Sequence, residues 1–308
     1  MVINRNITLG TQVSTMASLF TNLTLMAGVL AFYYCTVVLA HEPFKTLKGK
    51  FTATQSGLYD MPLTINDAVD SGYVWAGHDD DLNSSVYSLP GDTRVCVLFD
   101  CYSVIAGLRI CFIKADVGIR AASNNLSFPY NFDEKPQFVS HDYWDSPAWC
   151  FDVLFDCPET IKSGNRHYQE GVVADFIWLY IPTAPQGWTK IARDESGVLA
   201  QNFTKQGCYP GMGQHYFYEI SPTHTTDCQD YEGFFVIFDK GELIGLGISP
   251  VCSFTIGDRE WMEDAPLELI EIIVPYGPSC LDDWVTNYGI TGFHMFLVPN
   301  ASETTCPT

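Results

Sequence analysis

One strand pattern occurs twice in the chain, and it constrains the fold more than any other feature of the sequence. Residues 97–100 read Val-Leu-Phe-Asp and precede the apolar run 105–108, while residues 236–239 read Val-Ile-Phe-Asp and precede 244–246. In both places an apolar strand ends at an aspartate and a second apolar strand begins shortly afterwards. Two strands joined by a short turn form a β-hairpin. The sequence therefore predicts two copies of a strand-rich unit.

The repeat favours a mainly β fold, with α+β as the alternative, in which two related halves form tandem domains or a pseudo-twofold barrel or sandwich. A few short helices are expected, with 60–74 and 261–273 as the candidates, because strands dominate the periodic segments. The repeat extends upstream, where Gly77-His78 corresponds to Gln214-His215. The predicted organisation is a signal peptide at 1–40, a first half at 41–183, a proline-containing linker at 184–187, a second half at 188–299 and a tail at 300–308.

The N-terminal residues are typical of a secretory signal peptide. Arg5 is the only charge before the largely apolar run 25–40, and Ala40 is the small residue expected before a signal-peptidase cut. The alternative is an uncleaved signal anchor, because the mostly apolar stretch from Leu19 is long enough to span a bilayer. We expect a secreted, extracellular protein with no membrane attachment after cleavage.

Cysteine usage agrees with export. The sequence has 11 cysteines, of which Cys35 lies in the predicted leader. An even number in an oxidising compartment favours complete pairing, so the sequence predicts a fold stapled by disulfides. Ten cysteines are candidates for these bonds: Cys96, Cys101, Cys111, Cys150, Cys157, Cys208, Cys228, Cys252, Cys280 and Cys306.

After the predicted leader, four triplets match the acceptor pattern for N-glycosylation, at Asn83, Asn125, Asn202 and Asn300. In an exported protein such asparagines are expected on surface loops. The sequence therefore predicts a glycoprotein.

The charge balance and several missing motifs exclude common functions. The chain has 36 acidic and 16 basic residues, for a net charge of -20. Nucleic acid is not expected as a partner, because phosphate binding requires clustered Lys and Arg. The sequence also contains no Gly-x-Ser-x-Gly, His-Glu-x-x-His, Walker or Gly-x-Gly-x-x-Gly motif.

Residues 208–218 form the most distinctive segment of the second half. Pro210, Gly211 and Gly213 interrupt helical order and predict a tight loop. An aromatic strand follows and carries His215. A histidine held beside a rigid turn suits a ligand contact or an acid/base role, although a core histidine with a satisfied ring nitrogen has the same pattern.

Strand alternation assigns faces to the neighbours of this histidine. His215 should share a face with Phe217, with Tyr216 and Tyr218 opposite. These three aromatic residues and Phe293 are the candidate ligand-binding residues.

His294 lies on the aromatic strand that closes the second half, and we expect it to face the same interior as His215. Two imidazoles on neighbouring strands can bind a metal or exchange a proton with a substrate. His215 and His294 are therefore the candidate catalytic residues and candidate metal ligands. His78, followed by three aspartates, is a weaker metal candidate that also fits an exposed acidic turn. The cofactor is unknown, with a transition metal as the candidate.

The runs 87–90, 97–100 and 105–108, with the Gly-Met-Gly-Gln-His-Tyr motif at 211–216, resemble a group of secreted, cysteine-rich invertebrate proteins. The resemblance implies secretion and carries over no functional residue. Two functions stay open. One is a secreted glycoprotein that binds a small apolar or aromatic ligand near His215 and His294. The other is a secreted oxidoreductase, of monooxygenase, oxidase or luciferase type, that acts with oxygen on an aromatic molecule.

Overall fold

The computed structural model describes residues 41–49, 57–144, 146–185, 187–221, 228–254 and 259–307. The predicted leader, 1–40, lies outside the described residues, so its cleavage stays a prediction. Among the residues described, no helix is long and apolar enough to cross a membrane. Strands dominate, which confirms the mainly β prediction, and they form two antiparallel sheets of eight strands each.

The first sheet consists of strands from the first half and one strand from the second. Its order is β10-β9-β8-β6-β5-β4-β3, and β7 also pairs with β8. The strands span Val74–Asp79 (β3), Ser84–Leu89 (β4), Asp92–Phe99 (β5), Ile105–Ile113 (β6), Val139–Tyr143 (β7), Ser146–Leu154 (β8), Trp178–Tyr180 (β9) and Trp188–Lys190 (β10).

The second sheet repeats this arrangement. Its order is β11-β12-β13-β14-β16-β1-β2, and β15 also pairs with β16. The strands span Lys48–Gly49 (β1), Tyr59–Asp60 (β2), Phe203–Tyr209 (β11), Gly213–Tyr218 (β12), Phe234–Asp239 (β13), Glu242–Ile248 (β14), Glu263–Asp264 (β15) and Thr291–Phe296 (β16).

Matching backbone contacts relate the two sheets residue by residue. The amide of Ile105 donates to the carbonyl of Leu63 at 2.9 Å, and the amide of Leu243 donates to the carbonyl of Arg193 at 3.1 Å. Both contacts join the start of the second hairpin strand to the segment before a short helix. The repeated hairpins of the sequence are therefore equivalent in space.

Two glycines confirm the equivalence. A Cβ atom on Gly107 would lie 2.5 Å from the carbonyl oxygen of Val153, and a Cβ atom on Gly245 would lie 2.5 Å from that of Met295. Real Cβ atoms do not approach this closely. Both positions therefore require glycine for the same close approach of neighbouring strands.

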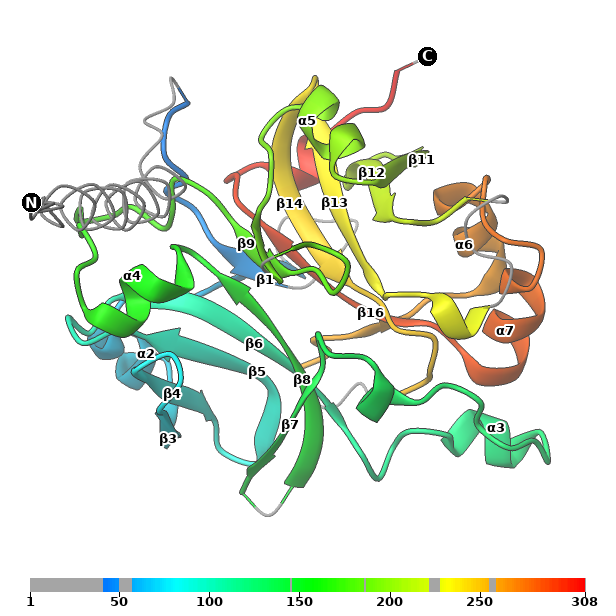
Figure 1. The fold of residues 1–308 in the computed structure, drawn as a ribbon, viewed down its shortest axis with the longest axis horizontal. Helices are drawn as coiled ribbons and strands as arrows, with labels where there is room; N and C mark the ends of the chain where they lie inside the picture. The colour runs from blue at the N-terminus through cyan, green and yellow to red at the C-terminus, as the bar shows by residue number, and fades with distance from the viewer. Residues whose placement is uncertain are drawn as a thin grey trace, which may run out of the picture. The chain divides into compact units, whose positions relative to one another are not determined.

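The halves exchange edge strands. β2 precedes the first half's helix α2 (Ile65–Asp70) but pairs in the second sheet, whereas β10 precedes the second half's helix α5 (Glu195–Ala200) but pairs in the first. Figure 1 shows the blue strand β1 running toward β16, with which it pairs. The halves are thus consecutive in sequence and interlocked in structure, as a pseudo-twofold sandwich.

A continuous apolar core lies between the sheets. It contains inward-facing residues of both, and the rings of Phe151 on β8 and Phe234 on β13 are 5.6 Å apart. Burial of these large side chains is the main stabilising contribution to the fold. The outer face of the second sheet has its own apolar cluster, which includes Ile270 of α6 (Leu267–Ile273) and Val285 of α7 (Leu281–Tyr288). Figure 1 shows both helices beside β16.

The helices are short, as the sequence predicts. α2 lies within 60–74 and α6 within 261–273, whereas α3 (Ile119–Ser123), α4 (Pro158–Ser163), α5 and α7 lie in segments that are not helix candidates. The described residues also form three single-turn helices: η2 (Phe132–Glu134), η3 (Cys228–Asp230) and η4 (Ala301–Glu303).

Disulfide bonds cross-link residues in both halves. Cys111 bonds Cys150 across β6 and β8, Cys208 bonds Cys306, and Cys228 bonds Cys280. Cys157 is disulfide-bonded as well.

Complete pairing of the ten cysteines is nevertheless a wrong prediction, because Cys96, Cys101 and Cys252 are free. Cys96 packs on β5 among apolar side chains, where burial raises the pKa of its thiol to about 12. Cys252 is buried in the core between the sheets. Both therefore act as small apolar residues. Cys101 is exposed at the turn between β5 and β6.

Candidate functional site

The turn before β12 fixes the position of His215. Gly211 and Gly213 have φ angles of 81° and 123°, which favour glycine, and a Cβ atom on Gly213 would lie 2.6 Å from the carbonyl oxygen of Phe238. The Cys208–Cys306 disulfide and a hydrogen bond from the amide of Gly211 to the carbonyl of Thr304 tie this turn to the C-terminal segment. The predicted loop and the strand after it are confirmed.

Alternation along β12 follows the prediction. Phe217 joins the outer cluster beside His215, whereas Tyr216 and Tyr218 lie in the core between the sheets. Phe293, on β16, lies in that core too. Of the four predicted ligand-binding aromatics, only Phe217 therefore faces the candidate site, because the other three point to the opposite face of the sheet.

His294 on β16 approaches His215 across the outer face of the sheet. It pairs with Gly247 on β14, and a Cβ atom on Gly247 would lie 2.1 Å from Cζ of Phe235. The missing side chain leaves room for the Phe235 ring beside both imidazoles, 5.3 Å from His215 and 5.2 Å from His294 between ring centroids. The imidazole centroids are 6.5 Å apart with an interplanar angle of 88°.

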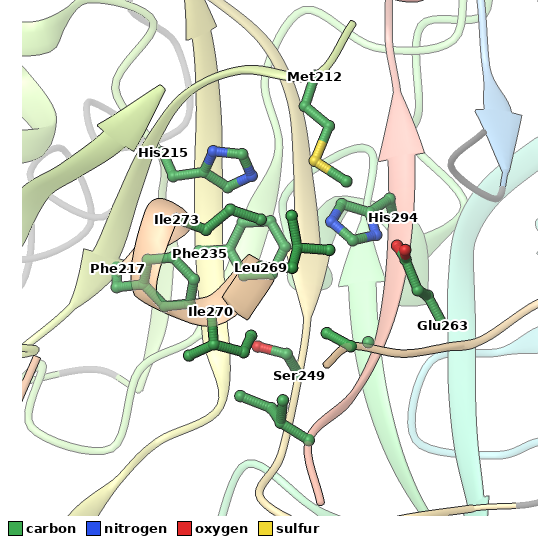
Figure 2. A pocket seen from close by; sticks show the side chains of 13 residues that line it. Met212, His215, Phe217, Phe235, Ser249, Glu263, Leu269, Ile270, Ile273 and His294 are labelled. Carbon is green, nitrogen blue, oxygen red and sulfur yellow. The ribbon is translucent and has the colours of Figure 1, made fainter. Parts of the chain in front are cut away.

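The two histidines line a small cavity of about 30 Å³, room for one or two water molecules. Its polar contributors besides the histidines are Ser249 and Glu263. Figure 2 shows the Glu263 carboxylate beside the imidazole of His294. The rest of the wall is apolar. Three of its residues, Leu269, Ile270 and Ile273, lie on α6. The others are Met212, Phe217, Phe235, Ala265, Ile290 and Gly292.

His215 is the unusual group of the cavity. Its side chain is fully buried, and neither ring nitrogen has a hydrogen-bond partner among the described residues. Burial lowers the pKa of His215 to about 4, and the nearby backbone groups of Gly207 and Gly213 offset this only in part. At neutral pH the ring is uncharged and offers one donor and one acceptor.

His294 is neutral for the same reason. Burial lowers the pKa of His294 to about 3, and the neighbouring His215 lowers it further. Two neutral imidazoles can contact a polar group of a ligand or donate lone pairs to a metal ion. Neither can serve as a cation at neutral pH.

The structure places His78 outside this site. His78 lies on β3 opposite Ser85, its side chain is 44% exposed, and its ring lies 3.9 Å from Asp80. β3 of the first sheet corresponds to β11 of the second. The residue equivalent to His78 is therefore Cys208, which stands opposite Gln214 as His78 stands opposite Ser85. The predicted correspondence of His78 with His215 is therefore wrong. No group of three or more His, Cys, Asp or Glu in the described segments could hold a metal ion.

The four predicted glycosylation asparagines are all exposed: Asn83, Asn125, Asn202 and Asn300. Their placement at the surface is compatible with the modification, which stays a prediction.

The first half has a buried cluster of charged and polar side chains at the position that corresponds to His294 in the second half. Arg109 on β6 pairs with Asp152 on β8, as Gly247 pairs with His294 in the second half. Arg109 donates to Asp152 at 2.7 and 2.6 Å, to Asp79 at 2.6 Å and to the Tyr143 hydroxyl at 2.6 Å. Sequence reasoning missed this buried cluster because its members come from four separate strands.

Sequence reasoning also missed Met212, Phe235, Ser249, Glu263 and the α6 residues of the cavity. One signal for them is present: Gly245 and Gly247 lie on the same face of an apolar strand. Glycines spaced in this way indicate that a neighbouring group closely approaches that face.

Comparison of the chain with protein-family models, with curated proteins and with solved structures found no match.

Proposed function

We propose that the chain is a secreted, disulfide-stabilised glycoprotein that binds a small apolar or aromatic ligand in the cavity beside His215 and His294. The observation that carries the proposal is His215, whose two ring nitrogens are buried without a hydrogen-bond partner among the described residues. A buried polar group without a partner costs free energy, and a ligand that supplies the partner recovers it.

The cavity wall suggests the chemistry of the ligand. Most of its residues are apolar, and the polar groups gather near the histidines. Binding sites for small molecules commonly combine apolar walls with a few placed polar groups. A ring with one hydroxyl group, whose hydrogen reaches His215, fits this arrangement.

A ring is larger than the cavity in this conformation, since about 30 Å³ accommodates only water-sized groups. Entry of a ring therefore requires the side chains of α6 to move apart. This helix has seven residues, and its N-terminal cap, Pro266, makes no side-chain hydrogen bond.

Secretion and glycosylation are part of the proposal. The disulfides between Cys111 and Cys150, Cys208 and Cys306, and Cys228 and Cys280 support an oxidising compartment. The exposed acceptor asparagines support the glycoprotein assignment. The net charge of -20 argues against nucleic acid as a partner. The oxidoreductase alternative stays a prediction.

Calorimetric titration of the chelator-treated protein with phenol and with benzene tests ligand binding. We expect phenol to bind about 10-fold more tightly than benzene, because only phenol supplies a hydroxyl to His215. Ile270→Trp, which fills the cavity, should abolish binding of both. Ile272→Trp is the matched control, since Ile272 is exposed on the same helix. Absence of phenol binding, or equal loss in both tryptophan variants, would contradict the proposal.

A further inference from the structure

Three side chains with lone-pair donors meet at one end of the cavity. Met212 and His215 are fully buried and His294 is 7% exposed, and all three line the cavity. Figure 2 shows the Met212 side chain pointing into the space between the two imidazoles. The donors come from a turn and two strands, so their convergence is a property of the fold.

The backbone holds the methionine in place. The amide of Met212 donates to the carbonyl of Tyr209 at 3.0 Å, and the following Gly213 has no room for a side chain. The same turn is tied to the C-terminal segment by Cys208–Cys306. A site whose donors are held in place by the fold loses little conformational entropy when it binds an ion.

The kinds of donor narrow the choice of ion. A thioether and two neutral imidazoles are soft or intermediate ligands, whereas Ca²⁺ and Mg²⁺ require oxygen donors. Among first-row metals, thioether sulfur selects copper(I). A monovalent ion is also easier to accommodate in a buried site than a divalent one, because desolvation costs rise with charge.

Glu263 lies where it can support such a site. It stands opposite Gly292 in the β15–β16 ladder, and Gly292 precedes His294 by two residues on the same face. Figure 2 shows its carboxylate beside the His294 ring. A carboxylate beside a ligating histidine orients the ring, and here it would also balance the charge of a monovalent cation.

From this convergence we propose that Met212, His215 and His294 form a copper(I) site. A cavity of about 30 Å³ has room for a single ion. His215, which has no hydrogen-bond partner among the described residues, has a ring nitrogen whose lone pair is available to coordinate the ion. The proposal goes beyond organic-ligand binding and does not depend on it, since phenol binding is measured on metal-free protein.

Anaerobic titration of the full chain with copper(I), in competition with bathocuproine disulfonate, tests the site. The Cys101→Ser background removes the exposed thiol, which is itself a soft copper ligand. We expect one tightly bound copper(I) per chain. His215→Leu and His294→Leu should each abolish it, and Met212→Leu should weaken it about 10-fold or more. Glu263→Gln should weaken it by about 10-fold.

Met295→Leu is the matched control, because Met295 is buried on the opposite face of β16. Since Met→Leu nearly conserves volume, both methionine variants should fold. X-ray absorption at the copper edge should show a sulfur ligand that disappears in Met212→Leu alone. The proposal is overturned if the Cys101→Ser protein binds no stoichiometric copper(I), or if Met212→Leu and Met295→Leu bind it equally.

Discussion

At matching positions of the two sheets, Arg109 stands opposite Asp152 in the first half and Gly247 stands opposite His294 in the second. The Arg109 guanidinium bonds two carboxylates and a hydroxyl, so its buried charge is matched by partners within the protein. His215 and His294 are instead neutral, and His215 has no hydrogen-bond partner among the described residues.

This difference in hydrogen bonding distinguishes a cluster that only stabilises the fold from a site that can bind a ligand. Burial favours the neutral form of Asp79, but Arg109 outweighs it, and the pKa of Asp79 lies below its usual value. The charged cluster is therefore complete without a ligand. In the second half, Gly247 has no side chain, and the Phe235 ring occupies the space beside it. The two imidazoles line a cavity next to this ring. One ladder thus supports a closed ion cluster in one copy and two neutral imidazoles beside a cavity in the other.

Removal of the guanidinium should have the largest effect on stability. Arg109→Met leaves the carboxylates of Asp79 and Asp152 with little exposure and without their cation, which should cost about 3–5 kcal/mol of unfolding free energy in urea. Lys205→Met is the control, because its ion pair with Glu195 is solvent-exposed and should contribute less than about 1 kcal/mol. A cost for Arg109→Met as small as that of Lys205→Met would refute a structural role for the cluster.

Acidification should weaken the second half through its histidines. In metal-free protein, His215 has a pKa of about 4 when folded and about 6.5 when unfolded, so the unfolded state binds more protons between these values. Stability therefore falls as the pH drops from about 6.5 to about 4, by about 3 kcal/mol for this group. The groups that face it are His294, which is also neutral, and Glu263.

Urea denaturation of His215→Leu across this pH range tests the expectation. The variant should be as stable as the native protein or more so at pH 7, because it removes a buried polar group without a partner. Its advantage should grow by about 3 kcal/mol toward pH 4. Met295→Leu, which changes a buried side chain that carries no titratable group, should leave the pH dependence unaltered. Parallel pH profiles for His215→Leu and the native protein would show that His215 keeps its usual pKa.

The parts of the fold predicted from sequence are those encoded locally. The repeated hairpins and the alternation from His215 to Tyr218 each depend on neighbouring residues, and both are confirmed. The prediction that His215 and His294 share one face is confirmed as well, but their strands are not neighbours, because β13 and β14 lie between β12 and β16. The face of a side chain can be deduced from a pattern with period two, whereas the order of the strands cannot.

The parts that could not be predicted depend on long-range pairing. β1 and β2 have two residues each, too few to show a period, yet they carry the exchange between sheets. The partners of Arg109 come from distant strands, and cysteine spacing does not reveal that Cys96 and Cys252 stay free. Helix α7 begins at Leu281, and its first turn contains Asp282 and Asp283, which interrupt an apolar pattern while favouring a helix N-terminus.

The smallest expected effect tests whether the halves remain equivalent outside the site. Thr64 caps α2 by accepting from the amide of Asp67 at 3.1 Å, and Asp194 caps α5 by accepting from the amide of Gly197 at 2.9 Å. Thr64→Ala and Asp194→Ala should each cost about 1 kcal/mol in urea denaturation, because each leaves a helix amide without its partner. Ser71→Ala, at the other end of α2, is the control, since Ser71 caps the helix through its backbone amide and should lose less than about 0.5 kcal/mol. Unequal costs at the two caps would show that the copies have diverged in their frameworks as well as in their outer faces.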